Sequence, residues 1–171
     1  MRDSSRLASL ILTDTGSATS LVTGEPEYIR VLNDKFAQSF EKLNWEQMIA
    51  AVRVTSGPFF RGMVESPRVE ELLQSAYEMI RHSDRVTIAN FVRSFYNDPD
   101  PCVEGLRAIR CPVLIIYGEK DDLFIESSKL MGREIPGAQI VEYSGAGHMT
   151  ALESPQRLVA DVIQFIAFHP V

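Results

Sequence analysis

The most restrictive feature of the sequence is a run of five large apolar side chains at residues 113–117, Val-Leu-Ile-Ile-Tyr. Gly118 ends the run, and the polar residues Glu-Lys-Asp-Asp follow at 119–122. An uninterrupted apolar run of this length, rich in β-branched residues, is typical of a strand buried on both faces of a parallel sheet. Such a strand needs helices on both faces, so the sequence predicts an α/β protein.

Two further segments are predicted as strands. Residues 6–14 (RLASLILTD) contain a compact apolar run that closes in Thr-Gly-Ser, and residues 138–143 form a weaker strand. A helix is expected at 124–131, and Ser154-Pro155 opens a final helix. The core stripe expected on that helix consists of Leu158, Val159, Val162, Ile163 and Ile166. Strands that alternate with helices in this way build an open parallel sheet.

The middle of the chain has a helical period and predicts four helices. The first helix begins after Pro26, and the residues on its apolar face are Ile29, Leu32, Phe36, Phe40 and Leu43. The second helix spans Trp45 to Val52. The third helix follows Ser66, which is expected to be its N-cap, and the fourth contains Ile88 to Phe95. Gly57-Pro58 is interpreted as a break, and 97–101 as a loop. Residues 21–110 are therefore expected to form an inserted helical cap on a core made of 1–20 and 111–171.

Composition narrows the possible functions. The net charge is −6, from 23 acidic and 17 basic residues, and the basic residues are scattered, so nucleic acid is not an expected partner. No apolar stretch approaches the roughly 18 residues that span a bilayer, which predicts no membrane association and a cytoplasmic location. Cys102 and Cys111 have no His or Cys at ligand spacing, so neither a disulfide framework nor a metal site is expected.

Polar residues follow two predicted neighbouring strands, where side chains that perform chemistry gather in parallel sheets. One loop is 118–122, and the other is Gly-Ala-Gly-His at 145–148. Histidine accepts and returns a proton near neutral pH, and a neighbouring carboxylate fixes its tautomer. The pattern predicts His148 as a general base and Asp121 as the carboxylate that orients it.

Other residues compete for these roles. Glu119 and Asp122 lie in the same loop, but the spacing of three residues after Gly118 favours Asp121. Asp14, after the first strand, is the alternative acid. Glu153 is expected to stabilise the start of the final helix through the helix dipole rather than to act in catalysis. His82 and His169 are expected to be solvated.

Three segments of the chain together resemble the α/β-hydrolase family. Residues 112–121 (PVLIIYGEKD) are similar to its acid-bearing strand and loop, 145–148 to its histidine loop, and 7–15 to its sixth strand. The resemblance implies a hydrolase that acts on ester-like small molecules through a nucleophile-His-Asp triad, with no cofactor. The aromatic group Trp45, Phe59, Phe60 and Phe95 is a candidate acyl or aryl pocket under the cap, with ordinary cap core as the alternative.

The family's nucleophile motif, Gly-x-Ser-x-Gly, does not occur in the sequence. The isolated chain is therefore expected to be inactive, as one part of a serine hydrolase. The alternative is a non-catalytic module that binds an apolar ligand or assembles with a partner. The strand at Leu7 to Leu12 would lack a neighbour on one side, which predicts a homodimer or a complex with a missing N-terminal half.

Overall fold

The computed structural model describes residues 6–17, 26–95 and 102–169 and has a parallel sheet at its centre. Strands β1 (Leu10–Thr13), β2 (Val113–Gly118) and β3 (Gln139–Tyr143) lie side by side in that order. Ile11 lies beside Leu114, and Ile115 lies beside Ile140. The apolar run is thus the central strand, and every residue of β2 is buried. The predicted α/β class is confirmed.

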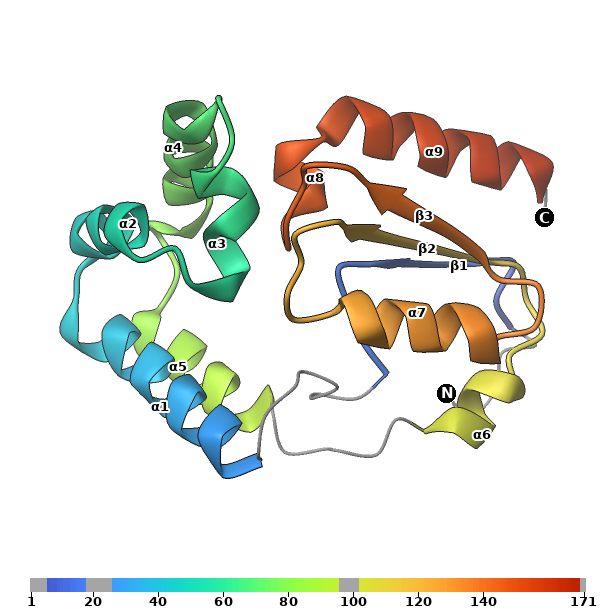
Figure 1. Ribbon diagram of the computed structural model, residues 1–171, viewed down its shortest axis with the longest axis horizontal. Helices are drawn as coiled ribbons and strands as arrows, with labels where there is room; N and C mark the ends of the chain where they lie inside the picture. Colours follow the sequence, from blue (N-terminus) through green and yellow to red (C-terminus); the bar gives the residue numbers. More distant parts are fainter. Residues whose placement is uncertain (1–5, 18–25, 96–101, 170–171) are drawn as a thin grey trace.

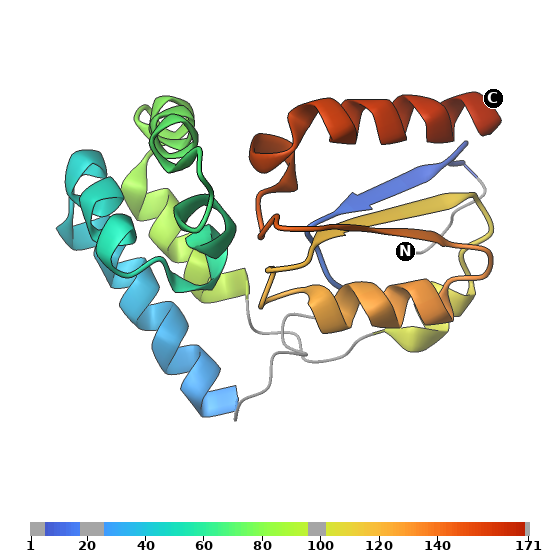
Figure 2. The ribbon, with the colours of Figure 1, turned by 45° about the horizontal axis from the view of Figure 1, so that its top comes forward.

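Helices cover both faces of the sheet (Figures 1 and 2). Helices α6 (Val103–Arg107) and α7 (Ile125–Glu134) lie on one face, and α9 (Pro155–Phe168), preceded by the short α8 (Thr150–Glu153), lies on the other. Successive strand residues face opposite sides. The cluster against α7 therefore contains Val113 and Ile115, whereas the cluster against α9 contains Leu114 and Ile116.

A separate helical layer lies beyond the ends of the strands, toward which the arrowheads of the sheet point (Figure 1). It consists of α1 (Pro26–Lys42), α2 (Trp45–Val54), α3 (Gly57–Val64), α4 (Val69–Ile80) and α5 (Arg85–Phe95). The start of α2 is fixed by Asn44, which accepts a hydrogen bond from Gln47 N while the Gln47 side chain accepts one from Asn44 N. This reciprocal pair is a capping box.

Within residues 26–95 the helical layer has five helices, one more than the sequence predicts. Helix α3 was missed because Gly57-Pro58 was interpreted as a break, whereas it opens the helix: Pro58 occupies the first turn, where its missing N–H costs nothing. The prediction of Ser66 as an N-cap was also wrong. Helix α4 begins at Val69 without a side-chain cap, and the Ser66 hydroxyl instead accepts from Arg68 N, which forms a turn before the helix.

Strand β1 is shorter than predicted. Its pairing with β2 begins where Leu10 N donates to Pro112 O, and Leu7 is 38% exposed. On its other side β1 has no neighbouring strand among the described residues. The strand therefore leaves one edge of the sheet open.

The core stripe predicted on α9 was too wide. Leu158 and Val162 pack against the sheet, but Val159, Ile163 and Ile166 are 56%, 63% and 49% exposed. A three-stranded sheet covers only one side of this helix, so part of its apolar surface faces outward. Within the described ranges, none of the helices combines the length and apolar character needed to cross a bilayer.

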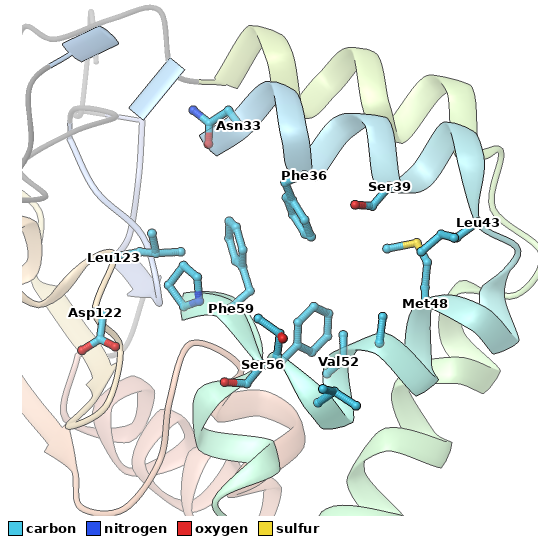
Figure 3. A pocket seen from close by; sticks show the side chains of 16 residues that line it. Asn33, Phe36, Ser39, Leu43, Met48, Val52, Ser56, Phe59, Asp122 and Leu123 are labelled. Atoms are coloured by element: carbon cyan, nitrogen blue, oxygen red, sulfur yellow. The ribbon is translucent and has the colours of Figure 1, made fainter. Parts of the chain in front are cut away.

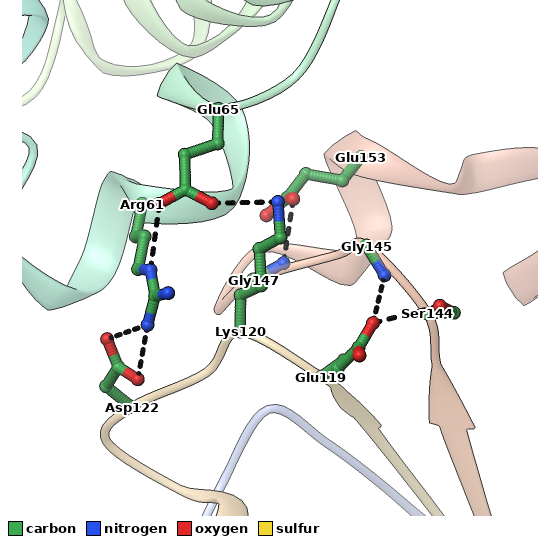
Figure 4. A network of polar contacts seen from close by, with 9 residues as sticks. All are labelled: Arg61, Glu65, Glu119, Lys120, Asp122, Ser144, Gly145, Gly147 and Glu153. Atoms are coloured by element: carbon green, nitrogen blue, oxygen red, sulfur yellow. Dashed lines mark hydrogen bonds and ion pairs between the residues drawn. The ribbon is translucent and has the colours of Figure 1, made fainter.

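Helix α3 joins the helical layer to the sheet. Arg61 forms two hydrogen bonds to the Asp122 carboxylate, at 2.8 and 2.9 Å, and Glu65 pairs with Lys120 Nζ at 2.8 Å (Figure 4). Between these ion pairs, Gly62 approaches Gly147 so closely that a Cβ at residue 62 would overlap its backbone nitrogen. The absence of a side chain at residue 62 is therefore what permits this contact.

We expect Gly62→Ala to destabilise the protein by about 1–3 kcal/mol, because the new methyl group overlaps backbone and the Glu153 carboxylate. This loss opposes the gain of about 1 kcal/mol that alanine brings to a helix. Gly132→Ala in α7 is the matched control, since its methyl group would meet only the end of the exposed Ile140 side chain. Urea unfolding measures the stability of both variants. Equal free energies of unfolding for the two would contradict the close contact between Gly62 and Gly147.

Candidate active site

The loops that follow β2 and β3 lie against each other at the edge of the sheet. Lys120 N donates to Ala146 O at 2.8 Å, and Glu119 N donates to Tyr143 O at 3.0 Å. The Glu119 carboxylate accepts from Gly145 N, where φ is +77°, a conformation that favours glycine. These contacts join the two loops independently of Asp121 and His148.

Asp121 and His148 are in direct contact. His148 Nδ1 lies 3.1 Å from Asp121 Oδ2, and the other carboxylate oxygen accepts from Leu123 N at 3.2 Å and Phe124 N at 3.3 Å. Asp121 is fully buried, whereas the His148 side chain is 16% exposed. A carboxylate so placed favours the tautomer with the proton on Nδ1, which leaves Nε2 able to accept a proton.

The His148 ring also contacts two aromatic rings from different parts of the fold. Phe124 stacks on it with centroids 5.1 Å apart and an interplanar angle of 24°. Phe59, from α3 of the helical layer, meets it edge-on at 5.0 Å. The imidazole is thus oriented by the carboxylate and by packing together.

Glu153 supports the histidine loop rather than the start of α9. Its two carboxylate oxygens accept from Gly147 N at 2.8 Å and Met149 N at 3.1 Å, the residues on either side of His148. It lies at the end of α8, two residues before α9 begins. The sequence analysis did not predict these two bonds, by which the Glu153 carboxylate holds the backbone on both sides of His148.

Asp14 lies close to this pair but bonds to a different residue. It follows β1 with a left-handed φ of +46°, and its Oδ2 accepts from Thr150 N at 2.9 Å and Thr150 Oγ1 at 2.6 Å. Burial raises the pKa of Asp14 to about 6, although the bonds from Thr150 and the charge of His148 act to lower it. Asp121 is therefore the carboxylate that contacts His148, whereas Asp14 binds Thr150.

A cavity of about 720 Å³ lies between α1, α2, α3 and the loop after β2 (Figure 3). Of the four aromatic residues predicted to line a pocket, Phe59 and Phe60 do so. Trp45 is not among the lining residues, because its ring packs against Phe40 inside the helical layer. The Phe95 side chain lies outside the described residues.

The sequence prediction missed the contribution of α1 to this cavity. Phe36 and Asn33 line it, whereas the sequence predicts only a core stripe for Phe36. A helical stripe alone does not separate core positions from cavity walls. The other histidines lie elsewhere: His82 is exposed, and His169 contacts the Phe165 ring at 4.8 Å. In the described part of the chain, no three His, Cys, Asp or Glu residues are grouped to hold a metal ion.

The fold resembles several solved structures, each of which is longer than this chain. MenH from S. aureus superposes with a TM-score of 0.73 at 21% identity, covering 95% of this chain and 59% of that one. A thermophilic esterase from Thermogutta terrifontis superposes with a TM-score of 0.64 at 24% identity, covering 95% of this chain and 57% of the esterase. An enol-lactonase from Burkholderia xenovorans LB400 superposes with a TM-score of 0.67 at 18% identity, covering 93% of this chain and 56% of the lactonase. The chain thus spans less than two thirds of each.

Sequence comparison agrees with the fold. The mouse (Mus musculus) Protein ABHD14A is 31% identical over 67 residues, which cover 39% of this chain and 27% of the mouse protein. The model of the alpha/beta hydrolase family matches residues 5–162, nearly the whole chain. The chain therefore belongs to the alpha/beta hydrolase family.

Proposed function

We propose that this chain supplies the base, His148, and the acid, Asp121, of a nucleophile-His-Asp triad that hydrolyses ester-like small molecules. The observation that carries the proposal is the 3.1 Å contact between His148 Nδ1 and the buried Asp121 carboxylate at the carboxyl end of the sheet. Family membership and the resemblance to an esterase and an enol-lactonase support hydrolysis as the type of reaction.

In the proposed reaction a hydroxyl nucleophile attacks the ester carbonyl and loses its proton to His148 Nε2. His148 then returns that proton to the departing alcohol, which leaves the acyl group on the nucleophile. Water attacks this acyl group with the same proton transfers through His148, which releases the acid and frees the nucleophile. Asp121 stabilises the imidazolium, and its second oxygen, held by Leu123 N and Phe124 N, keeps the carboxylate from rotating. No step requires a cofactor.

The nucleophile and the oxyanion hole are proposed to lie in a polypeptide segment outside these 171 residues. No Gly-x-Ser-x-Gly occurs here, and the similar structures are longer than this chain. The second candidate function is a binding module without chemistry, which the apolar cavity favours because this chain alone forms it. An in-frame Gly-x-Ser-x-Gly in the DNA upstream of Met1 would favour the enzyme.

The open edge of β1 is proposed to pair with a strand of that nucleophile-bearing segment, or with a second copy of the chain when the segment is absent. Leu10 N and Asp14 N donate to β2, so the N–H groups that alternate with them, at Ile11 and Thr13, face the open side. Unpaired edge groups on an apolar strand are a template for association.

The proposed function leads to three further predictions, of which the first concerns the triad. The isolated chain should have negligible activity on an activated ester such as p-nitrophenyl acetate, because most rate enhancement depends on the nucleophile and oxyanion hole. Fused to the Gly-x-Ser-x-Gly segment of an active family member, it should hydrolyse the ester. Asp121→Asn should then lower kcat about 10⁴-fold, and His148→Ala by at least as much.

His82→Ala is the matched control for these variants, because His82 is exposed and should leave kcat unchanged. Cooperative unfolding and circular dichroism would verify that each fusion is folded. A folded fusion without activity, or an isolated chain whose turnover disappears in His148→Ala, would contradict the proposed division of the site.

The second prediction concerns pH. In the unfolded chain Asp14 should titrate near 3.9, whereas burial raises its pKa to about 6 in the folded protein. Between about pH 4 and 6 the folded state therefore holds a proton that the unfolded state has released, and the stability due to this carboxyl is lost as the pH rises. Relative to Asp14→Asn, we expect the free energy of unfolding of the wild-type protein to fall by about 1–3 kcal/mol as the pH rises through this window.

Urea unfolding at intervals from pH 4 to 7 measures this difference. Asparagine tolerates the left-handed backbone and can still accept from Thr150, so the variant removes only the titration. Asp84→Asn is the control, since Asp84 is exposed and its hydrogen bonds to Thr87 lower its pKa. If the difference in free energy of unfolding between wild type and Asp14→Asn stays constant with pH, the raised pKa of Asp14 is refuted.

The third prediction concerns association. The isolated chain should sediment as a dimer at high concentration, and Thr13→Pro should shift it toward monomer by removing an outward N–H. Proline is tolerated at an edge position whose N–H makes no bond within the sheet. Thr13→Val, which keeps the N–H, is the matched control. A wild-type chain that remains monomeric throughout the concentration series would count against association through β1.

A further inference from the structure

We infer that Glu153 is a positioning residue for His148, the proposed base, and that helix α3 keeps the Glu153 carboxylate in its place. The inference deepens the proposed function and rests on it where catalysis is concerned. Its structural part needs no nucleophile: the Glu153 carboxylate fixes the backbone on both sides of His148 and so directs the imidazole toward Asp121.

The Glu153 carboxylate uses both of its oxygens on the peptide groups next to His148. Oε2 accepts from Gly147 N at 2.8 Å, a bond drawn in Figure 4, and Oε1 accepts from Met149 N at 3.1 Å. Because a single planar carboxylate holds the N–H groups on both sides of residue 148, a rotation of the backbone there breaks at least one of the two bonds. The direction of the imidazole thus depends on Glu153 as well as on Asp121.

Glu153 is suited to this role because it is itself anchored. Its own N–H donates to Met149 O at 2.9 Å, so Glu153 and Met149 are joined through both backbone and side chain. Within the described part of the chain, neither Gly147 N nor Met149 N donates to a backbone carbonyl. Since backbone N–H groups are strong donors that require a partner, both depend on the Glu153 carboxylate.

The Glu153 carboxylate is held by directed hydrogen bonds rather than by a cation. Of the two cations drawn beside it in Figure 4, Arg61 binds Asp122 and Glu65, and Lys120 binds Glu65. Hydrogen bonds from N–H groups to a carboxylate are shorter and stronger than those to a neutral acceptor. A neutral amide of the same size in place of Glu153 would therefore weaken the hold on the histidine loop and leave these ion pairs intact.

Helix α3 closes against the same carboxylate. A Cβ at residue 62 would overlap both Glu153 Oε2 and Gly147 N, so Gly62 packs directly against the bond between them. Phe59, three residues earlier in α3, contacts the His148 imidazole and lines the cavity. The helix that forms a wall of the cavity thus also keeps the Glu153 bond in place, which links the position of α3 to the orientation of His148.

Glu153→Gln tests the inference in the isolated chain. Glutamine keeps the size of the side chain, but its NH2 group must face the N–H of either Gly147 or Met149, which then loses its acceptor. NMR correlation spectra of the imidazole at alkaline pH show which ring nitrogen carries the proton. We expect Nδ1 in wild type, as the contact with Asp121 favours, and a loss of that preference in Glu153→Gln, because the ring no longer faces the carboxylate.

Glu119→Gln is the matched control for the NMR measurement. The Glu119 carboxylate also accepts from the loop before His148, from Gly145 N at 2.8 Å and Ser144 Oγ at 2.9 Å, but both bonds end on Oε2. One glutamine oxygen can keep both bonds, so the His148 tautomer should be unchanged. Should Glu153→Gln not fold, Gly62→Ala, which displaces the carboxylate without altering it, should shift the tautomer in the same direction.

The fusion with a nucleophile-bearing segment gives a second measurement. Glu153→Gln should lower kcat about 10- to 100-fold, the loss that a small misplacement of a catalytic group causes. This loss is smaller than that expected for Asp121→Asn, because Glu153 acts only through the backbone. KM should be unchanged, since Glu153 is not among the residues that line the cavity.

The inference would be overturned if wild-type His148 showed no preference for the proton on Nδ1, or if Glu153→Gln left that preference intact. An equal change in Glu119→Gln, or an active Glu153→Gln fusion with unchanged kcat, would overturn it as well. The NMR outcomes are independent of hydrolysis, because the isolated chain is used. A tautomer that depends on Glu153 together with an inactive wild-type fusion would therefore contradict only the proposed triad.

Discussion

The parallel pairing of β2 with β3 is the constraint on which the rest of the structure depends. It aligns Gly118 with Tyr143 at the ends of the two strands, so the loops that follow leave the sheet at the same edge. Because the two loops leave the sheet together, the Asp121 carboxylate, three residues beyond Gly118, reaches the His148 imidazole, five residues beyond Tyr143. A shift of one residue in this register would turn every side chain of the shifted strand to the other face and separate the pair.

Helix α3 makes the helical layer part of the site rather than a separate lid. From one helix, Phe59 contacts the His148 imidazole, Arg61 binds Asp122 next to Asp121, and Gly62 meets the backbone before His148. The ion pairs are open to solvent and therefore add little stability, so the close packing at Gly62 is the stronger part of this contact. Since Phe59 also lines the cavity, a ligand bound there would touch a ring that contacts the His148 imidazole.

Local patterns explain which features were predictable from the sequence. The apolar run of β2, the glycine and polar residues after it, and the histidine loop are each contiguous, so the sequence alone was sufficient to select Asp121 and His148 as a pair. What failed depends on distant parts of the chain: the exposed face of α9 is set by the width of the sheet, and the α1 wall of the cavity by packing against α3. The bond from Thr150 to Asp14 joins residues 136 positions apart, which no local pattern reveals.

The two buried carboxylates near His148 differ in their partners, and that difference gives them different tasks. Asp121 accepts from two backbone N–H groups and faces the imidazole, so its negative charge is well compensated. Asp14 has only Thr150 as a bonded partner and one buried oxygen without a partner in the described residues, which suits an anchor between β1 and the segment after His148. Each of the three strands thus holds the histidine loop: β1 through Asp14, β2 through Asp121, and β3 through the chain itself. A sheet of three strands is therefore sufficient to hold the imidazole of His148 in place.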